Sequence, residues 1–117
     1  MQNVVVFGGA GFVGSHLVEA LLKQDKNITV IDDFSNGSQS NLSTISDKIK
    51  VVKFDIVNRD WSSLMDLKPD VIFHFASNAD VRGSFDNPIS FVENNNSITV
   101  NLLEAARRLN LKSIIII

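Results

Sequence analysis

Short apolar runs alternate with longer segments of helical spacing along the chain. We expect strands where the runs are short, rich in β-branched residues and bounded by polar residues, at residues 4–7, 27–32, 50–54, 70–75 and 113–117. Apolar residues three and four positions apart predict helices over residues 12–24, 61–67 and 88–109. These connections are too long for hairpins, so the strands should be parallel. We therefore predict a single α/β domain over residues 1–117, with a doubly wound, Rossmann-type sheet of about five strands ordered 3-2-1-4-5.

A cluster of glycines, in the segment GGAGFVG, follows the first predicted strand. The glycines fit two overlapping patterns, Gly9-x-Gly11-x-x-Gly14 and Gly8-x-x-Gly11-x-x-Gly14. A turn without Cβ atoms bends tightly and lets a pyrophosphate approach, while the N–H groups and positive dipole end of the next helix face that anion. The pattern alone is weak evidence, since a glycine-rich turn can also bind nothing.

An acidic residue, Asp32, ends the second predicted strand, about twenty residues after the turn. A carboxylate there can accept hydrogen bonds from both hydroxyls of an adenosine ribose, and it repels a 2′-phosphate. Asp33 adds a second negative charge, and no arginine occurs before Arg59. A solvated loop carboxylate is the alternative. Because strand, turn, helix and acid occur in the right order, we expect dinucleotide binding, with NAD preferred over NADP. The polar stretch 33–46 is predicted to be a loop with one short helical turn.

Composition argues against several other classes of protein. The net charge of −2 leaves no basic patch of the kind that nucleic acid or an anionic membrane requires. Without cysteine there is no disulfide framework and no thiolate metal site, and no residues have metal-ligand spacing. The apolar start is too short for a signal or membrane-spanning segment. We expect a cytoplasmic protein with no metal and no nucleic-acid or membrane partner.

Four segments resemble the extended short-chain dehydrogenase/reductases, and within them the nucleotide-sugar epimerases and dehydratases of the UDP-glucose 4-epimerase type. The segments read GGAGFVGSHLVEALL, VIDDFSNGS, KFDIVN and VIFHFASNADVRGSFDNP, the last followed by a helix that ends NLLEAARR. The resemblance implies NAD as cofactor and a glycine turn in the Gly8-x-x-Gly11-x-x-Gly14 register. It also implies that residues 33–37 surround the adenosine, that Asp55 and Ile56 flank the adenine, that residues 75–79 run along the cofactor, and that Asn95 lies near the nicotinamide. The implied cofactor-binding residues are Gly8, Gly11, Phe12, Val13, Gly14, Asp32, Asp33, Phe34, Ser35, Asn36, Gly37, Asp55, Ile56, Phe75, Ala76, Ser77, Asn78, Ala79 and Asn95.

The chain departs from the family pattern at two positions, where Ser77 replaces the usual alanine and Ile98 a small glycine. Residues 94–96 are three successive asparagines in a predicted helix, against helix propensity. One of them facing a ligand is one explanation, and a surface face with a kink is the other. His74 closes a core strand and is expected to be a hydrogen-bonded structural histidine, while His16 on the first helix is expected to be solvent-facing or packed.

In the family, chemistry depends on a Ser or Thr just beyond the fifth strand and a Tyr-x-x-x-Lys on the next helix. This sequence has no tyrosine. We expect the N-terminal part of an NAD-binding domain, truncated after the fifth strand and lacking the catalytic segment and substrate domain. The fragment should bind NAD weakly and be inactive, whereas its parent acts on a nucleotide sugar. A non-catalytic dinucleotide sensor and a pure assembly module are the alternatives.

The long helix also has a wider apolar stripe than one sheet contact requires. Ile98, Leu102, Ala105 and Leu109 can face the sheet, which leaves an adjoining face of Val92, Leu103 and Ala106. The last strand is uncharged and β-branched, and such an edge invites pairing with another chain. The sequence therefore predicts a homo-oligomer.

Overall fold

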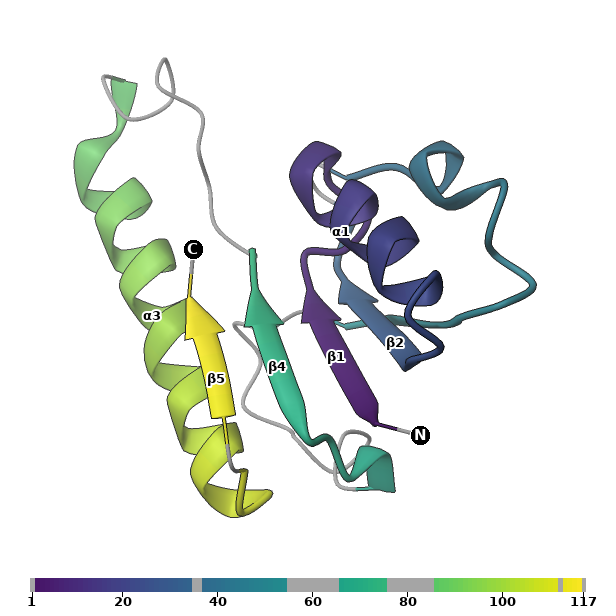
Figure 1. Cartoon of the computed structure of the whole chain (residues 1–117). Helices are drawn as coiled ribbons and strands as arrows, with labels where there is room; N and C mark the ends of the chain where they lie inside the picture. Colours follow the sequence, from purple (N-terminus) through teal and green to yellow (C-terminus); the bar gives the residue numbers. More distant parts are fainter. Residues whose placement is uncertain (1, 35–36, 55–65, 76–85, 112, 117) are drawn as a thin grey trace.

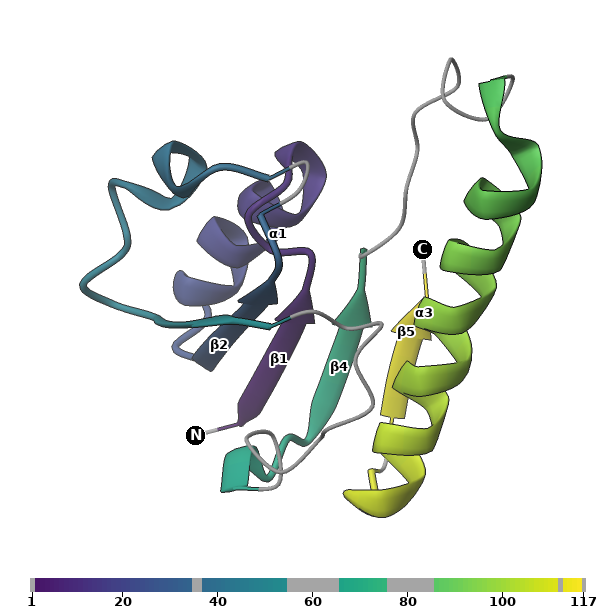
Figure 2. The same ribbon diagram turned by 180° about the vertical axis from the view of Figure 1, so that it is seen from behind.

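A single parallel sheet with helices on both faces forms the fold (Figures 1 and 2). The computed structural model describes residues 2–34, 37–54, 66–75, 86–111 and 113–116. The strands are β1 (Asn3–Phe7), β2 (Asn27–Asp32), β3 (Lys50–Lys53), β4 (Val71–His74) and β5 (Ser113–Ile116). The helices are α1 (Phe12–Leu22), a short 3₁₀ helix η1 (Gln39–Leu42) and α3 (Pro88–Arg108).

The strand order is β3-β2-β1-β4-β5, and every neighbouring pair is parallel. The predicted parallel order 3-2-1-4 is thus confirmed, and β5 pairs with β4 at the edge, from Val71↔Ser113 to His74↔Ile116. The η1 helix is the short turn predicted within residues 33–46. Most of the helix predicted over 61–67 lies outside the described residues, and the other elements end within two residues of their predicted bounds.

The unbroken apolar run of β1 is explained by helices on both sides of it. Val4 and Val6 pack with Val18 of α1, whereas Val5 and Phe7 pack with Leu102 of α3. Because successive side chains of a strand point to opposite faces, both faces of β1 must be apolar. Figures 1 and 2 show α1 and α3 on opposite faces of the sheet.

The amino edge of the sheet is tied together by side-chain amides and a carboxylate. The Asn3 backbone N–H donates to Asp70 Oδ2 at 2.8 Å, and Asn27 Nδ2 donates to Asn3 Oδ1 at 2.8 Å. These bonds hold the starts of β1, β2 and β4 in register. They lie at the opposite edge of the sheet from the loops that follow the carboxyl ends of the strands. In open parallel sheets, ligands bind outside this carboxyl edge.

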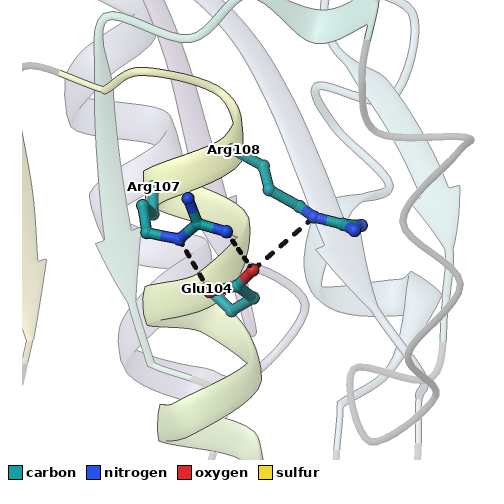
Figure 3. A network of polar contacts seen from close by, with 3 residues as sticks. All are labelled: Glu104, Arg107 and Arg108. Carbon is teal, nitrogen blue, oxygen red and sulfur yellow. Dashed lines mark hydrogen bonds and ion pairs between the residues drawn. The ribbon is translucent and has the colours of Figure 1, made fainter.

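The ends of α3 follow the usual chemistry of helix termini. Asn87 Oδ1 accepts from the Ser90 N–H at 3.3 Å, and Pro88 occupies the first turn. Near the other end, Glu104 bonds Arg107 at 2.6 Å and lies 3.6 Å from Arg108 (Figure 3). The hydrogen bond from Arg107 lowers the pKa of Glu104, and the pair is exposed to solvent. None of the described helices is long and apolar enough to span a membrane.

Candidate functional site

The turn between β1 and α1 closes around the carbonyl oxygen of Gly8. Gly8 has φ 80°, a left-handed conformation that glycine adopts without steric cost. The Gly11 N–H donates to the Gly8 oxygen at 3.2 Å. A Cβ on Gly14 would collide with this oxygen and lie 3.0 Å from Gly9 Cα. Gly9 is restricted as well, because a Cβ there would lie 2.9 Å from Val30 Cγ1, so the structure gives a steric reason for glycine at positions 8, 9 and 14 and leaves both glycine patterns open.

The start of α1 has no side-chain cap of its own, because its N-cap residue, Gly11, makes no side-chain hydrogen bond to the first N–H groups of the helix. Gly11 is the N-cap in an extended conformation, and the first turn contains no acidic residue. The positive end of the helix dipole is thus available to an anion. Phe12 and Val13 are 77% and 59% exposed at this end. His16 is exposed to solvent and its ring lies 4.9 Å from the Phe12 ring, so both alternatives expected of it, solvent-facing and packed, apply.

Asp32 ends β2 beside this turn and accepts two backbone hydrogen bonds. The Ala10 N–H donates to its Oδ2 at 3.0 Å, and the Phe34 N–H donates to its Oδ1 at 2.9 Å. Each carboxylate oxygen has two lone pairs, so within the described part of the chain each keeps one acceptor position after these bonds. Asp32 therefore holds the turn and still presents negative oxygens at the carboxyl edge of the sheet.

The loop after β2 returns to the same turn, which the sequence did not indicate. The Ser38 N–H and Asn41 Nδ2 both donate to the carbonyl oxygen of Ala10, at 3.0 and 2.8 Å. The two residues lie about thirty positions after Ala10 along the chain, and no spacing rule joins residues so far apart. Spatial proximity is the signal for these contacts, and only the structure contains it.

The other predicted site residues are distributed as follows. Phe34, in a left-handed conformation with φ 61°, and Gly37 lie in the loop that meets the glycine turn, and Asp33 is exposed at the start of this loop. The Phe75 N–H donates to the Phe7 oxygen at 2.8 Å, and its ring packs on the α1 face. Asn95 is half-buried on α3, across the sheet from α1 (Figure 1). Outside the described residues lie Ser35, Asn36, Asp55, Ile56, Ala76, Ser77, Asn78 and Ala79.

One expectation about a core residue requires correction. His74 is buried as predicted, with 4% of its surface exposed, but its Nδ1 finds no hydrogen-bond partner in the described part of the chain. Burial lowers the pKa of His74, because a charged imidazole would lose its hydration.

Ile98, one of the two departures from the family pattern, packs against the α3-side core. Among residues of described placement, no three His, Cys, Asp or Glu side chains are grouped to hold a metal ion.

A sequence model of the NAD dependent epimerase/dehydratase family matches residues 4–117. The chain belongs to this family. Among curated relatives of the family, a UDP-glucose 4-epimerase of Mycolicibacterium smegmatis is 40% identical over 97% of this chain and 37% of its own length. A dTDP-glucose 4,6-dehydratase of Mycobacterium tuberculosis is 33% identical over 92% of this chain and 33% of its own.

The solved structures of the family include a UDP-glucose 4-epimerase from Stenotrophomonas maltophila with bound NAD and formylated UDP-arabinopyranose. It superposes with a TM-score of 0.90 at 28% identity, covering 99% of this chain and 36% of the epimerase. The chain thus spans about a third of the length of these family members. The part of this chain that superposes on the epimerase contains the glycine turn, Asp32 and the carboxyl edge between them.

Proposed function

We propose that these residues are the NAD-binding portion of a nucleotide-sugar epimerase of the UDP-glucose 4-epimerase type. The observation that carries the proposal is the position of Asp32, whose carboxylate accepts from the Ala10 N–H in the glycine turn, two residues before α1 begins. A NAD-bound epimerase in the family supports the choice of cofactor. The higher identity to an epimerase than to a dehydratase supports the choice of reaction.

The turn is shaped for an anion with an attached ribose. Gly8 supplies the left-handed conformation of the turn, and the absence of a Cβ at Gly14 lets the turn lie close to α1. The helix end offers N–H groups and a positive dipole to a pyrophosphate. The remaining lone pairs of Asp32 would accept the ribose hydroxyls, and its charge would repel a 2′-phosphate. Bound NAD supplies hydride exchange with the sugar. The protein residues described here bind and orient its adenosine half.

The family resemblance implies that a tyrosine exchanges the proton with the sugar hydroxyl. Because these 117 residues contain no tyrosine, they cannot supply that group by themselves. We therefore propose that they bind NAD weakly and turn over no nucleotide sugar, and that the whole protein acts on a UDP-sugar. UDP-glucose supplied to the purified chain with NAD should remain unchanged, and sustained epimerisation by a contaminant-free preparation would refute this.

We also propose that the chain associates with a second copy through α3. Of the residues predicted to face the sheet, Leu102 and Ala105 are buried, and Ile98 and Leu109 are half-buried. Facing away from it, α3 exposes apolar side chains that recur at helical spacing: Ile89, Val92, Val100 and Leu103. These exposed apolar side chains on one face of the helix support association, because apolar surface patches often mark interaction sites.

The cofactor proposal is best tested by varying the ligand and leaving the protein intact. An Asp32→Ala variant would also break the bonds from Ala10 and Phe34, so its loss of binding would be ambiguous. Calorimetric titration of the unaltered chain with NAD, NADP, ADP and 2′-deoxy-ADP avoids this problem. A hydrogen bond to a charged group contributes about 1.5–3 kcal/mol, so 2′-deoxy-ADP should bind roughly tenfold or more weakly than ADP. NADP should likewise bind roughly tenfold or more weakly than NAD. Equal affinities for NAD and NADP, or no binding of any of these ligands, would overturn the proposal.

A further inference from the structure

Ala10 lies at the centre of the candidate site, and both of its backbone polar groups are engaged by segments distant in sequence. Its side chain is fully buried. Its N–H donates to Asp32 Oδ2 at 3.0 Å, and its carbonyl oxygen accepts from the Ser38 N–H at 3.0 Å and from Asn41 Nδ2 at 2.8 Å. The middle of the glycine turn is therefore fixed from outside the turn, by the end of β2 and by the loop that follows β2.

The loop is built to approach Ala10 closely. A Cβ on Gly37 would lie 2.8 Å from the Ala10 carbonyl carbon and 2.9 Å from its oxygen, so only glycine allows the two backbones this contact. Ser38 then begins η1, and its hydroxyl accepts from the Ser40 N–H at 3.2 Å. The 3₁₀ turn places Asn41 over Ala10, and the next residue, Leu42, is buried in the α1-side core at 2% exposure. Leu42 anchors the segment, and Asn41 connects it to the turn.

We propose that Asn41 is a positioning residue for the dinucleotide. Its amide, together with the Ser38 N–H, locks the loop after β2 onto the glycine turn through the Ala10 oxygen. The lock fixes the separation between Asp32, which would accept the ribose, and the α1 N–H groups, which would face the pyrophosphate. Its contribution is preorganisation: a ligand that spans both parts binds without first having to order them. The inference rests on the proposed cofactor function and adds a role for a residue outside the implied cofactor set.

Asn41 is exposed, so its side chain can be changed with little effect on the core. Asn41→Asp has nearly the same shape but cannot donate, and its charge would repel the Ala10 oxygen. Asn41→Ala removes the donor without adding charge. Asn41→Gln keeps an amide donor on a side chain that is one methylene longer. Ser43→Ala is the matched control, because it removes an exposed side-chain hydrogen bond at the end of η1 that goes to the Ser40 oxygen and does not involve Ala10.

The experiment is an NMR titration of the wild type and these four variants with ADP and with adenosine. It is run at a temperature where circular dichroism shows each protein to be folded. ADP spans the ribose and phosphate parts of the site, and adenosine reaches only the first. Asn41→Asp and Asn41→Ala should bind ADP about fivefold to tenfold more weakly than wild type, with a smaller loss for adenosine. Asn41→Gln should recover part of the ADP affinity, and Ser43→Ala should match wild type. The Ser38 amide should exchange with solvent faster in both Asn41→Asp and Asn41→Ala.

The outcomes separate the inference from the function on which it rests. No ADP binding by wild type would overturn the proposed function and the inference with it. Unchanged ADP affinity in Asn41→Asp and Asn41→Ala, beside a wild type that binds, would overturn the inference alone. An equal loss for ADP and adenosine would assign Asn41 a general structural role and would also overturn it.

Discussion

Replacing Gly14 with alanine tests the packing of the glycine turn, because two opposing effects can be weighed against each other. Alanine is favoured over glycine inside a helix by about 1 kcal/mol, which by itself would stabilise the protein. The new Cβ, however, would lie 3.0 Å from Gly9 Cα and 3.1 Å from the Gly8 carbonyl carbon, and closer still to the Gly8 oxygen. These neighbours are backbone atoms, so they cannot move aside by changing a rotamer.

Overpacking in a well-ordered site costs about 1–3 kcal/mol, and a backbone obstacle places Gly14→Ala at or above the upper end of this range. After subtracting the helix-propensity gain, we expect a net loss of about 2 kcal/mol in the free energy of unfolding. For a domain of this size the loss corresponds to a fall of roughly 8 °C in Tm. The displaced Gly8 carbonyl should also weaken ADP binding.

Urea unfolding followed by far-UV circular dichroism measures the loss directly. Gly11→Ala is the matched control, because its Cβ would lie 3.3 Å from the Gly8 oxygen, where a small adjustment relieves the contact. Gly11→Ala should cost no more than about 1 kcal/mol, from the poorer N-cap. A Gly14→Ala protein as stable as wild type, or more stable, would show that the turn does not pack against α1 as described.

Further predictions concern the core and the outer face of α3. Burial lowers the pKa of His74 in the folded protein, whereas the pKa of an unfolded histidine is about 6.5. The contribution of His74 to the free energy of unfolding is therefore complete above that pH. It falls as the pH decreases toward the lower pKa of the folded state, by at most about 1.4 kcal/mol per pH unit. Urea midpoints at pH 7.5 and pH 5.5 should reveal this slope in His16→Gln but not in His74→Leu; an unchanged slope in His74→Leu would assign it elsewhere. Light scattering at micromolar concentration should show an oligomer for wild type and a monomer for Leu103→Glu. A monomeric wild type would refute association, and an oligomeric Leu103→Glu would place it on another surface.

Much of the fold could be predicted from the sequence because its signals are local. The apolar runs of β1 and β2 indicate strands buried on two faces, and the lengths between them require parallel crossover connections. The glycine turn and Asp32 could be placed together because the carboxyl ends of adjacent parallel strands meet at one edge. Helix and strand ends were less predictable, since a final turn depends on capping and tertiary contacts.

The features that were not predicted depend on contacts between residues far apart in sequence. Nothing in the local pattern around Asn41 shows that its amide reaches Ala10, or that Asp32 is already bonded to the turn it was expected to serve. Among the residues that the structure describes, Nδ1 of His74 has no hydrogen-bond partner, and the sequence could not show this because it depends on the surroundings of the side chain. Sequence spacing predicted the residue types of the candidate site, and the structure shows the contacts among those of them that it describes.

The measurement that tests the central claim most directly is the mapping of backbone amide shifts in an isotopically labelled chain on addition of NAD. Binding at the proposed site should shift the amides of Phe12 and Val13 at the start of α1 and those of Asp33 and Phe34 after β2. The amides near Arg107, at the far end of α3, should not move. Saturable shifts confined to α3 would contradict the account. So would the absence of shifts at both the start of α1 and the segment after β2 at millimolar NAD.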